Sequence, residues 1–209
     1  MTMEDAMPNE DTRAPAAPPR AQPPRAINHV VLNVRNLDVS HRFWTEIIGF
    51  RCVAELKPVP GRKRPKMRFY SGLDAHGGVT HHDLALAEAP RAEGGAPPEP
   101  WDLSPSRVGL NHVAIAWPDR ESWLKQLAFL KAKGVPFHRR VNHGMTHSVY
   151  VSDPDGHGIE VLYELPREVW EQDIDAAQNY SEQLPTEGDE TLVDRTDYPV
   201  FKGTPGPGP

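Results

Sequence analysis

Apolar and polar residues follow the same order in two halves of this 209-residue chain. Each half opens with a short apolar run that carries an Asn-His pair at its second and third positions, at residues 27–34 and 110–116. Apolar residues then recur at helical spacing, at 39–48 and at 123–130. Both halves are therefore predicted to begin with a strand followed by a helix.

Residues typical of helix ends stand on either side of both helical patterns. Asp38 and Asp119 precede the two patterns and are the predicted N-caps. Gly49 and Gly134 follow them and are the predicted stops.

Three strand-like segments follow each helix, so each half has the order βαβββ. Asp153, Pro154, Asp155 and Gly156 have proline at the second and glycine at the fourth position of a turn, which predicts a hairpin between the last two strands. The predicted strands are 50–56, 67–71 and 82–87 in the first half, and 135–140, 148–152 and 158–164 in the second.

Two tandem βαβββ modules predict an α+β fold. A sheet with a helix on one face needs cover on the other, and two such modules can cover each other by curling into one mixed sheet around a shared cleft. We expect this domain at residues 26–166, with modules at about 26–88 and 108–165 and a Pro/Gly/Ala-rich linker at 89–107.

The segments outside this domain differ in composition. Residues 1–25 are rich in Pro, Ala and charge, which predicts a disordered arm. Residues 167–209 predict a helix from Arg167 to about Tyr180, followed by an extended, irregular tail that packs on the domain.

Composition excludes several classes of function. The net charge is −6 and basic residues are scattered, unlike the basic patch of a nucleic-acid-binding protein. No stretch reaches the roughly 18 apolar residues of a membrane-spanning helix. The single cysteine, Cys52, cannot form an internal disulfide, and the N-terminus lacks the basic and apolar start of a secretion signal. We expect a cytoplasmic protein without nucleic-acid or membrane partners; the oligomeric state stays open, a homo-oligomer included.

Three residues are candidate metal ligands. His29 and His112 occupy equivalent positions in the two opening strands, each on the face opposite its apolar neighbour. Glu160 is a carboxylate inside an apolar strand, where an unpaired charge would cost several kcal/mol. Two imidazoles and one carboxylate form the facial triad of non-haem Fe(II) sites, and the set also suits Mn(II). The structural alternative is that both histidines bond to backbone and Glu160 pairs with an arginine.

Further polar residues are predicted to reach the same cleft. His81 and His82 precede the last strand of the first module, and a histidine there is suited to moving protons because its pKa lies near neutrality. His143 stands on a turn beside Tyr150. The alternatives are solvated turn histidines and ordinary loop and strand residues.

These motifs resemble the vicinal oxygen chelate superfamily, which includes glyoxalase I, fosfomycin-resistance enzymes, methylmalonyl-CoA epimerase and the type I extradiol dioxygenases. The resemblance covers about residues 27–164. It rests on the two Asn-His openings and on residues 148–161 (SVYVSDPDGHGIEV), which are similar to the family's closing hairpin with its metal-binding glutamate. It implies that His29, His112 and Glu160 bind the metal.

The ligand positions distinguish activities within this family. Glyoxalase I and the epimerase draw a fourth ligand from the last strand of the first module, whereas extradiol dioxygenases use three ligands and place an acid-base histidine near that strand. Here the dioxygenase resemblance implies that His82 is this histidine and that Tyr150 donates a hydrogen bond to substrate. His143 would close the pocket, although the family's additional pocket histidine lies further upstream of the tyrosine.

The predicted function is cleavage of a catechol-type aromatic diol by O2 at an Fe(II) site, with Mn(II) or another divalent metal as the alternative cofactor. Two other functions stay open. One is a non-oxidative, metal-dependent glyoxalase, epimerase or transferase of the same fold, in which His82 would be a fourth ligand. The other is a non-catalytic module that binds an aromatic ligand.

Overall fold

The computed structural model describes residues 26–57, 59–61, 63–74, 76–89, 101–102, 108–195 and 197–202. The predicted arm at 1–25 and most of the predicted linker at 89–107 lie outside the described residues.

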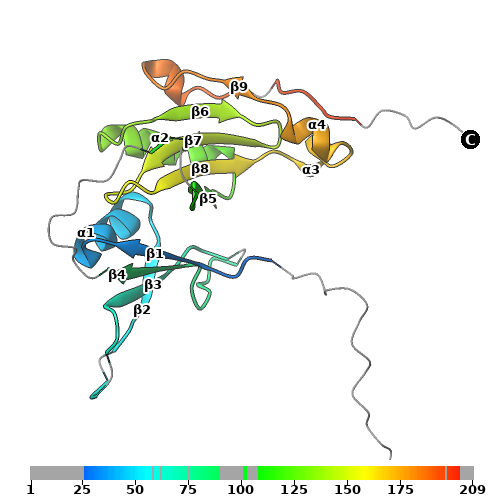
Figure 1. Ribbon diagram of the computed structural model, residues 1–209. Helices are drawn as coiled ribbons and strands as arrows, with labels where there is room; N and C mark the ends of the chain where they lie inside the picture. Colours follow the sequence, from blue (N-terminus) through cyan, green and yellow to red (C-terminus); the bar gives the residue numbers. More distant parts are fainter. Residues whose placement is uncertain are drawn as a thin grey trace, which may run out of the picture.

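The predicted α+β fold with two βαβββ modules is confirmed (Figure 1). The first module consists of β1 (Val30–Val34), α1 (Leu37–Arg42), the π-helical segment η1 (Phe43–Ile47), β2 (Arg51–Glu55), β3 (Met67–Ser71) and β4 (Leu84–Glu88). The second consists of β5 (His112–Ala116), α2 (Arg120–Ala132), β6 (Arg139–Asn142), β7 (Thr146–Ser152) and β8 (Gly158–Glu164).

The helix ends match the predictions with one exception. Asp119 caps α2 as predicted, because its carboxylate accepts a hydrogen bond from the Ser122 N–H at 2.7 Å. The prediction of Asp38 as the cap of α1 was wrong. Asn36 is the cap, and its side-chain oxygen accepts from the N–H groups of Asp38 and Val39 at 3.0 and 3.1 Å. The helix therefore starts earlier than the apolar pattern indicated.

The strands of the described residues form two sheets rather than one continuous sheet. Their orders are β1-β4-β3-β2 and β5-β8-β7-β6-β9, with β1 parallel to β4 and β5 parallel to β8. Each opening strand is therefore an edge of its own sheet. Module contact relies instead on side chains and on a hydrophobic core that includes buried residues of both modules.

The β7–β8 turn supplies polar contacts between the modules. The Asp155 carboxylate accepts hydrogen bonds from the Arg35 side chain at 2.7 Å and from the Ser40 hydroxyl at 2.9 Å. The Gln126 side chain of α2 adds a bond to the Ile47 carbonyl at 2.8 Å. These contacts fix one module against the other without a strand ladder.

The C-terminal extension packs on the second module. It contains α3 (Arg167–Trp170), α4 (Ile174–Gln178), β9 (Glu182–Gln183) and the 3-10 helix η2 (Asp189–Leu192). The helix predicted from Arg167 to about Tyr180 is divided in two, because Asp173 caps a new helix by accepting from the Ala176 N–H at 3.0 Å. Strand β9 pairs with β6 and is a two-residue edge strand of the five-stranded sheet.

In the part of the chain that the structure describes, no helix combines the length and apolar character needed to cross a membrane.

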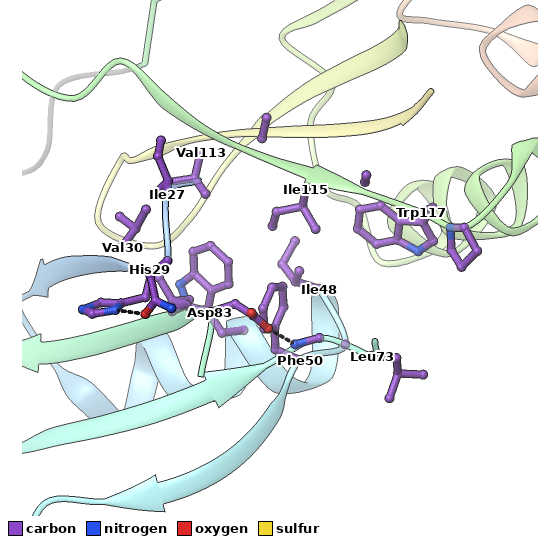
Figure 2. A pocket seen from close by; sticks show the side chains of 18 residues that line it. Ile27, His29, Val30, Ile48, Phe50, Leu73, Asp83, Val113, Ile115 and Trp117 are labelled. Atoms are coloured by element: carbon purple, nitrogen blue, oxygen red, sulfur yellow. Dashed lines mark hydrogen bonds between the residues drawn. The ribbon is translucent and has the colours of Figure 1, made fainter. Parts of the chain in front are cut away.

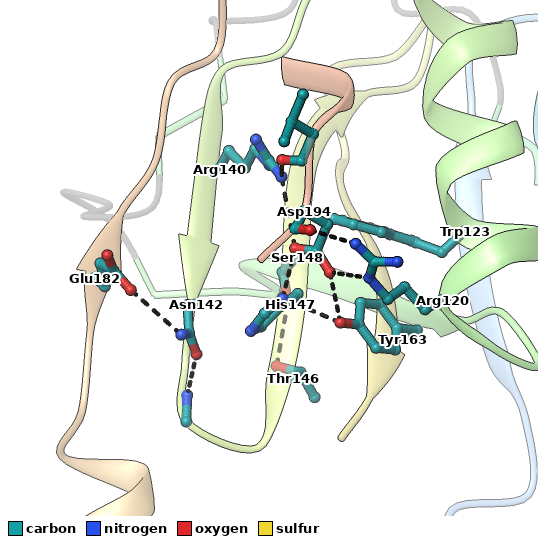
Figure 3. Close-up of polar contacts among 12 residues, drawn as sticks. Arg120, Trp123, Arg140, Asn142, Thr146, His147, Ser148, Tyr163, Glu182 and Asp194 are labelled. Atoms are coloured by element: carbon teal, nitrogen blue, oxygen red, sulfur yellow. Dashed lines mark hydrogen bonds and ion pairs between the residues drawn. The ribbon is translucent and has the colours of Figure 1, made fainter. Parts of the chain in front are cut away.

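A buried charged cluster holds the extension in place (Figure 3). Asp194, whose side chain is fully buried, contacts four side chains: His147 at 2.7 Å, Tyr163 at 2.7 Å, Arg120 at 2.8 Å and Arg140 at 3.6 Å. Burial alone would raise the pKa of the Asp194 carboxyl, but the hydrogen bonds from His147, Tyr163 and Arg120 outweigh it, so its pKa lies below its ordinary value. The carboxylate is therefore charged and neutralises buried Arg140.

Asp194→Asn should lower the free energy of unfolding by about 3–5 kcal/mol, because it leaves the buried Arg140 guanidinium without a counter-charge. Urea denaturation measures this loss. The same change at an exposed position of the extension, Glu187→Gln, should alter stability by less than about 0.5 kcal/mol. Equal stability of the two variants would contradict the account of the cluster.

The β7–β8 turn contains a hydrogen-bonded pair of a carboxylate and a histidine, Asp153 and His157. The Asp153 carboxylate accepts from the N–H groups of Asp155 and His157 at 2.9 and 2.8 Å, and it bonds to the His157 ring at 2.9 Å. The hydrogen bond to Asp153 raises the pKa of His157 above its ordinary value.

The contribution of His157 to stability should depend on pH. Its folded pKa is raised above the unfolded value of about 6.5, so the stabilisation is complete below that pH and is lost as the pH rises through the folded pKa. The difference in unfolding free energy between the wild type and His157→Gln, followed by urea denaturation, should shrink across this window. In an Asp153→Asn background the difference should no longer vary there.

Candidate metal centre

The parallel pairing of β5 and β8 brings two predicted ligands together. His112 pairs with Gly158, and Glu160 lies two positions further along β8 on the same face. The His112 Nε2 atom is 3.1 Å from Glu160 Oε2, and Glu160 is only 6% exposed. His112 and Glu160, two of the three predicted ligands, therefore lie together inside the second module.

Glu160 carries a buried negative charge. Burial would raise the pKa of its carboxyl, but hydrogen bonds from His112, Ser148 and Tyr150 lower it further than burial raises it. Its pKa therefore lies below the ordinary value for glutamate. A carboxylate held ionised in this way needs a positive partner, which is either protonated His112 or a metal ion.

The second module also contains the predicted tyrosine and its neighbouring histidine. Tyr150 lies directly across from Glu160 on β7, and its hydroxyl is 2.9 Å from His143 Nε2. Burial, reinforced by the charge of Glu160, raises the pKa of Tyr150, and burial lowers the pKa of His143. Both groups are therefore neutral, and the tyrosine keeps a proton that it can donate.

Trp101 covers this group, which the sequence analysis did not foresee. Its ring stacks on Tyr150 with centroids 5.2 Å apart and meets the His112 ring edge-on at 6.4 Å. Its indole N–H donates to the Asn111 carbonyl at 2.7 Å. A Cβ atom at Gly158 would overlap the indole nitrogen, so the glycine leaves room for the ring. The available signal was a large aromatic residue inside the predicted Pro/Gly/Ala-rich linker.

The first module holds a separate histidine group. The rings of His29 and His82 have centroids 4.4 Å apart, and Nδ1 of His81 is 2.9 Å from Nδ1 of His82. Burial and the neighbouring charges of His29 and His81 lower the pKa of His82. The structure therefore brings the predicted acid-base histidine to the predicted ligand of the same module.

The structure does not join the two groups. Among the described residues, no three His, Cys, Asp or Glu side chains lie close enough together to hold one ion. A cavity of about 490 Å³ lies between the modules (Figure 2), and of the predicted site residues it is lined by His29 alone. Apolar side chains form most of its walls, among them Ile48, Phe50, Val113 and Ile115. The three-ligand site stays a prediction.

The half-site in the second module fits a divalent ion. Adjacent ligands around an octahedral ion, with bonds of about 2.1 Å, stand about 3.0 Å apart. The separation of 3.1 Å between His112 Nε2 and Glu160 Oε2 corresponds to this spacing. Imidazole nitrogen and carboxylate oxygen also suit Fe(II) and Mn(II).

Strand register defines which residue of the first module is equivalent to Glu160. Ala114 pairs with Glu160, and Val31 pairs with Ala85. Ala114 and Val31 each follow a predicted ligand histidine by two positions, so Ala85 takes the place of Glu160. The first module therefore has no ligand side chain at this position, and His82 lies before β4 begins.

Residues 26–161 match the family model described as the Glyoxalase/Bleomycin resistance protein/Dioxygenase superfamily. The chain is 32% identical over 149 residues to the catechol-2,3-dioxygenase of Bacillus subtilis (strain 168), an alignment that covers 70% of this chain and 44% of that protein. It is 30% identical over 133 residues to biphenyl-2,3-diol 1,2-dioxygenase 3 of Rhodococcus globerulus, covering 64% of this chain and 60% of that protein. It is 24% identical over 181 residues to the lactoylglutathione lyase of Pseudomonas putida, covering 76% and 98%. The chain thus spans about half the length of the two dioxygenases.

Gly158→Ala should displace Trp101 from Tyr150, because the added methyl group needs the space of the indole ring. The expected result is a shifted indole N–H resonance with faster solvent exchange, assigned by its absence in Trp101→Phe. Gly109→Ala is the matched control, since a Cβ there meets no atom within 4 Å. An unchanged Trp101 resonance in Gly158→Ala would contradict the described packing.

Proposed function

Because the chain belongs to the glyoxalase/bleomycin resistance protein/dioxygenase superfamily, we propose that it cleaves a catechol-type aromatic diol with O2 as an extradiol dioxygenase. In this proposal, His29, His112 and Glu160 hold a divalent metal. Fe(II) is the first choice and Mn(II) the alternative.

The presence of Ala85 at the position equivalent to Glu160 is the observation that favours ring cleavage over the reactions of the four-ligand members. The four-ligand members of the superfamily draw a ligand from the last strand of the first module, and the pairing of β1 with β4 puts Ala85 at the place equivalent to Glu160. A methyl group cannot bind a metal. The chain then offers three ligands, as the extradiol enzymes do, and the names of two relatives support the same reaction.

A divalent ion bound by three protein ligands would leave positions at which the diol and O2 are held side by side, which makes their encounter effectively intramolecular. Side chains of the protein would then transfer protons and orient the substrate. In this proposal His82, whose ring contacts those of His29 and His81, is the group that takes and returns the phenolic proton.

Tyr150 and His143 would orient the substrate. The Tyr150 hydroxyl stays protonated because burial and the Glu160 charge raise its pKa, and its single O–H, which bonds to Glu160 in this structure, would turn to a substrate oxygen. His143 holds that hydroxyl at 2.9 Å. Trp101 covers the same side of the site and presents an aromatic surface that excludes water.

The lactoylglutathione lyase of Pseudomonas putida gives a reason to retain a second function. Its similarity extends over 98% of its own length, unlike that of the dioxygenases. The corresponding candidate is a non-oxidative isomerase in which the metal acts as a Lewis acid and His82 is a fourth ligand. Non-catalytic binding of an aromatic ligand is the third outcome that the experiments separate.

Anaerobic reconstitution with Fe(II), followed by catechols and air, should give a yellow ring-fission product with consumption of O2. Absorption spectroscopy and an oxygen electrode measure the two. Bound iron without product from a panel of diols would contradict the proposed reaction and favour the isomerase or the binding module. Mn(II) reconstitution under the same conditions distinguishes the two metals.

Variants should separate ligands from the acid-base group. His29→Ala, His112→Ala and Glu160→Ala should lose the metal, whereas His82→Ala should retain it and lose roughly 10²- to 10⁴-fold in turnover. Metal content by mass spectrometry and initial rates are the measurements. His76→Ala, at an exposed loop position, is the matched control and should keep both. Loss of metal in His82→Ala would instead support four ligands.

A further inference from the structure

The asparagines that precede the two proposed ligand histidines make the same contact in both modules. Asn111 Oδ1 lies 2.6 Å from Nδ1 of His112, and Asn28 Oδ1 lies 2.8 Å from Nδ1 of His29. Both asparagines stand before their strands begin, so the backbone there is not held to strand alternation and adjacent side chains can meet. A contact repeated at equivalent positions indicates a shared role.

The surroundings of Asn111 determine which way its amide points. Its Nδ2 lies 3.3 Å from the backbone carbonyl of Asp102, and a carbonyl oxygen can only accept. The amide nitrogen must therefore face Asp102, and the amide oxygen must face His112. Because that oxygen has no proton to give, Nδ1 of His112 must be the donor.

This hydrogen bond assigns the other ring nitrogen. A neutral imidazole carries one N–H, so a proton on Nδ1 leaves Nε2 with a lone pair. Nε2 of His112 is also the atom that faces Glu160 at 3.1 Å. In the described structure a proton on Nε2 joins His112 to Glu160 as a hydrogen bond, and a cation would take the place of that proton.

The first module repeats the arrangement in a more exposed setting. Asn28 Nδ2 lies 3.4 Å from Nε2 of His81, a ring nitrogen that donates or accepts according to its tautomer, so the direction of the Asn28 amide is taken from its equivalence with Asn111. Asn28 is exposed, whereas Asn111 is half-buried. Water can replace the oxygen of Asn28 more readily than that of Asn111, so the contact at Asn111 contributes more to the orientation of its histidine.

We propose that Asn111 and Asn28 are positioning residues that keep the proton of His112 and His29 on Nδ1 and aim each Nε2 at the metal. The inference rests on the proposed function, since it takes these histidines as ligands. Partners that orient a ligand histidine in this way typically change metal affinity by about 10- to 100-fold.

The test compares Mn(II) affinities, measured from the electron paramagnetic resonance signal of free Mn(II). Asn111→Leu removes the acceptor at similar size and should raise the dissociation constant about 10- to 100-fold. Asn28→Leu should raise it by less. Asn33→Leu makes the same change at an exposed position on β1 and should leave it unaltered.

Asn111→Asp separates two contacts of the Asn111 side chain, those with His112 and Asp102. It keeps an acceptor for His112 but loses the donor to Asp102, so it should bind Mn(II) at least as tightly as the wild type. A purely structural role through Asp102 would weaken both variants equally and would overturn the inference. Urea denaturation of each variant identifies any loss that comes from unfolding.

Nuclear magnetic resonance of the Zn(II)-loaded protein detects the proton on Nδ1 of His112 directly. The Nδ1–H of His112 should give a resonance protected from exchange in the wild type and in Asn111→Asp, and it should be absent in Asn111→Leu. Wild-type affinity in Asn111→Leu would overturn the inference alone. Failure of the wild type to bind Mn(II), Fe(II) or Zn(II) would overturn the proposed function together with it.

Discussion

The second module depends on one buried carboxylate and on the strand pairing that positions it. Glu160 is 6% exposed, and the parallel pairing of β5 with β8 places it 3.1 Å from His112 Nε2. An ionised group in such a position costs free energy unless positive charge and hydrogen bonds compensate it. Tyr150, Ser148 and His112 supply those bonds, so the polar group around Glu160 and the pKa shifts of its members follow from this single requirement.

Much of the fold was predictable because local patterns encode it. Strands β3 and β8 were predicted at residues 67–71 and 158–164, which are their observed bounds, because turns or loops flank their apolar runs on both sides. Strand β6 was predicted at 135–140 but spans Arg139–Asn142. The residues after α2 are apolar enough for a strand, but their ladder with β7 begins only at Arg139.

The candidate site was predictable within modules and not between them. Grouping His112 with Glu160, and Tyr150 with His143, follows from strand pairing and a short turn, both of which act over neighbouring elements. The distance from His29 to that pair depends on how the two modules dock, and no periodicity in the chain gives that distance. The position of Trp101 was not predictable because its ring occupies the space left by Gly158, which has no side chain and lies far along the chain.

The β7–β8 turn has a mechanical consequence for the site. Asp155 is tied to Arg35 and Ser40 of the first module, and the strand that leaves the same turn carries Glu160. A rotation of one module against the other therefore pulls directly on the backbone that holds the carboxylate. Because this one turn contacts the first module and leads into the strand of Glu160, the width of the cavity between the modules and the position of Glu160 are mechanically coupled.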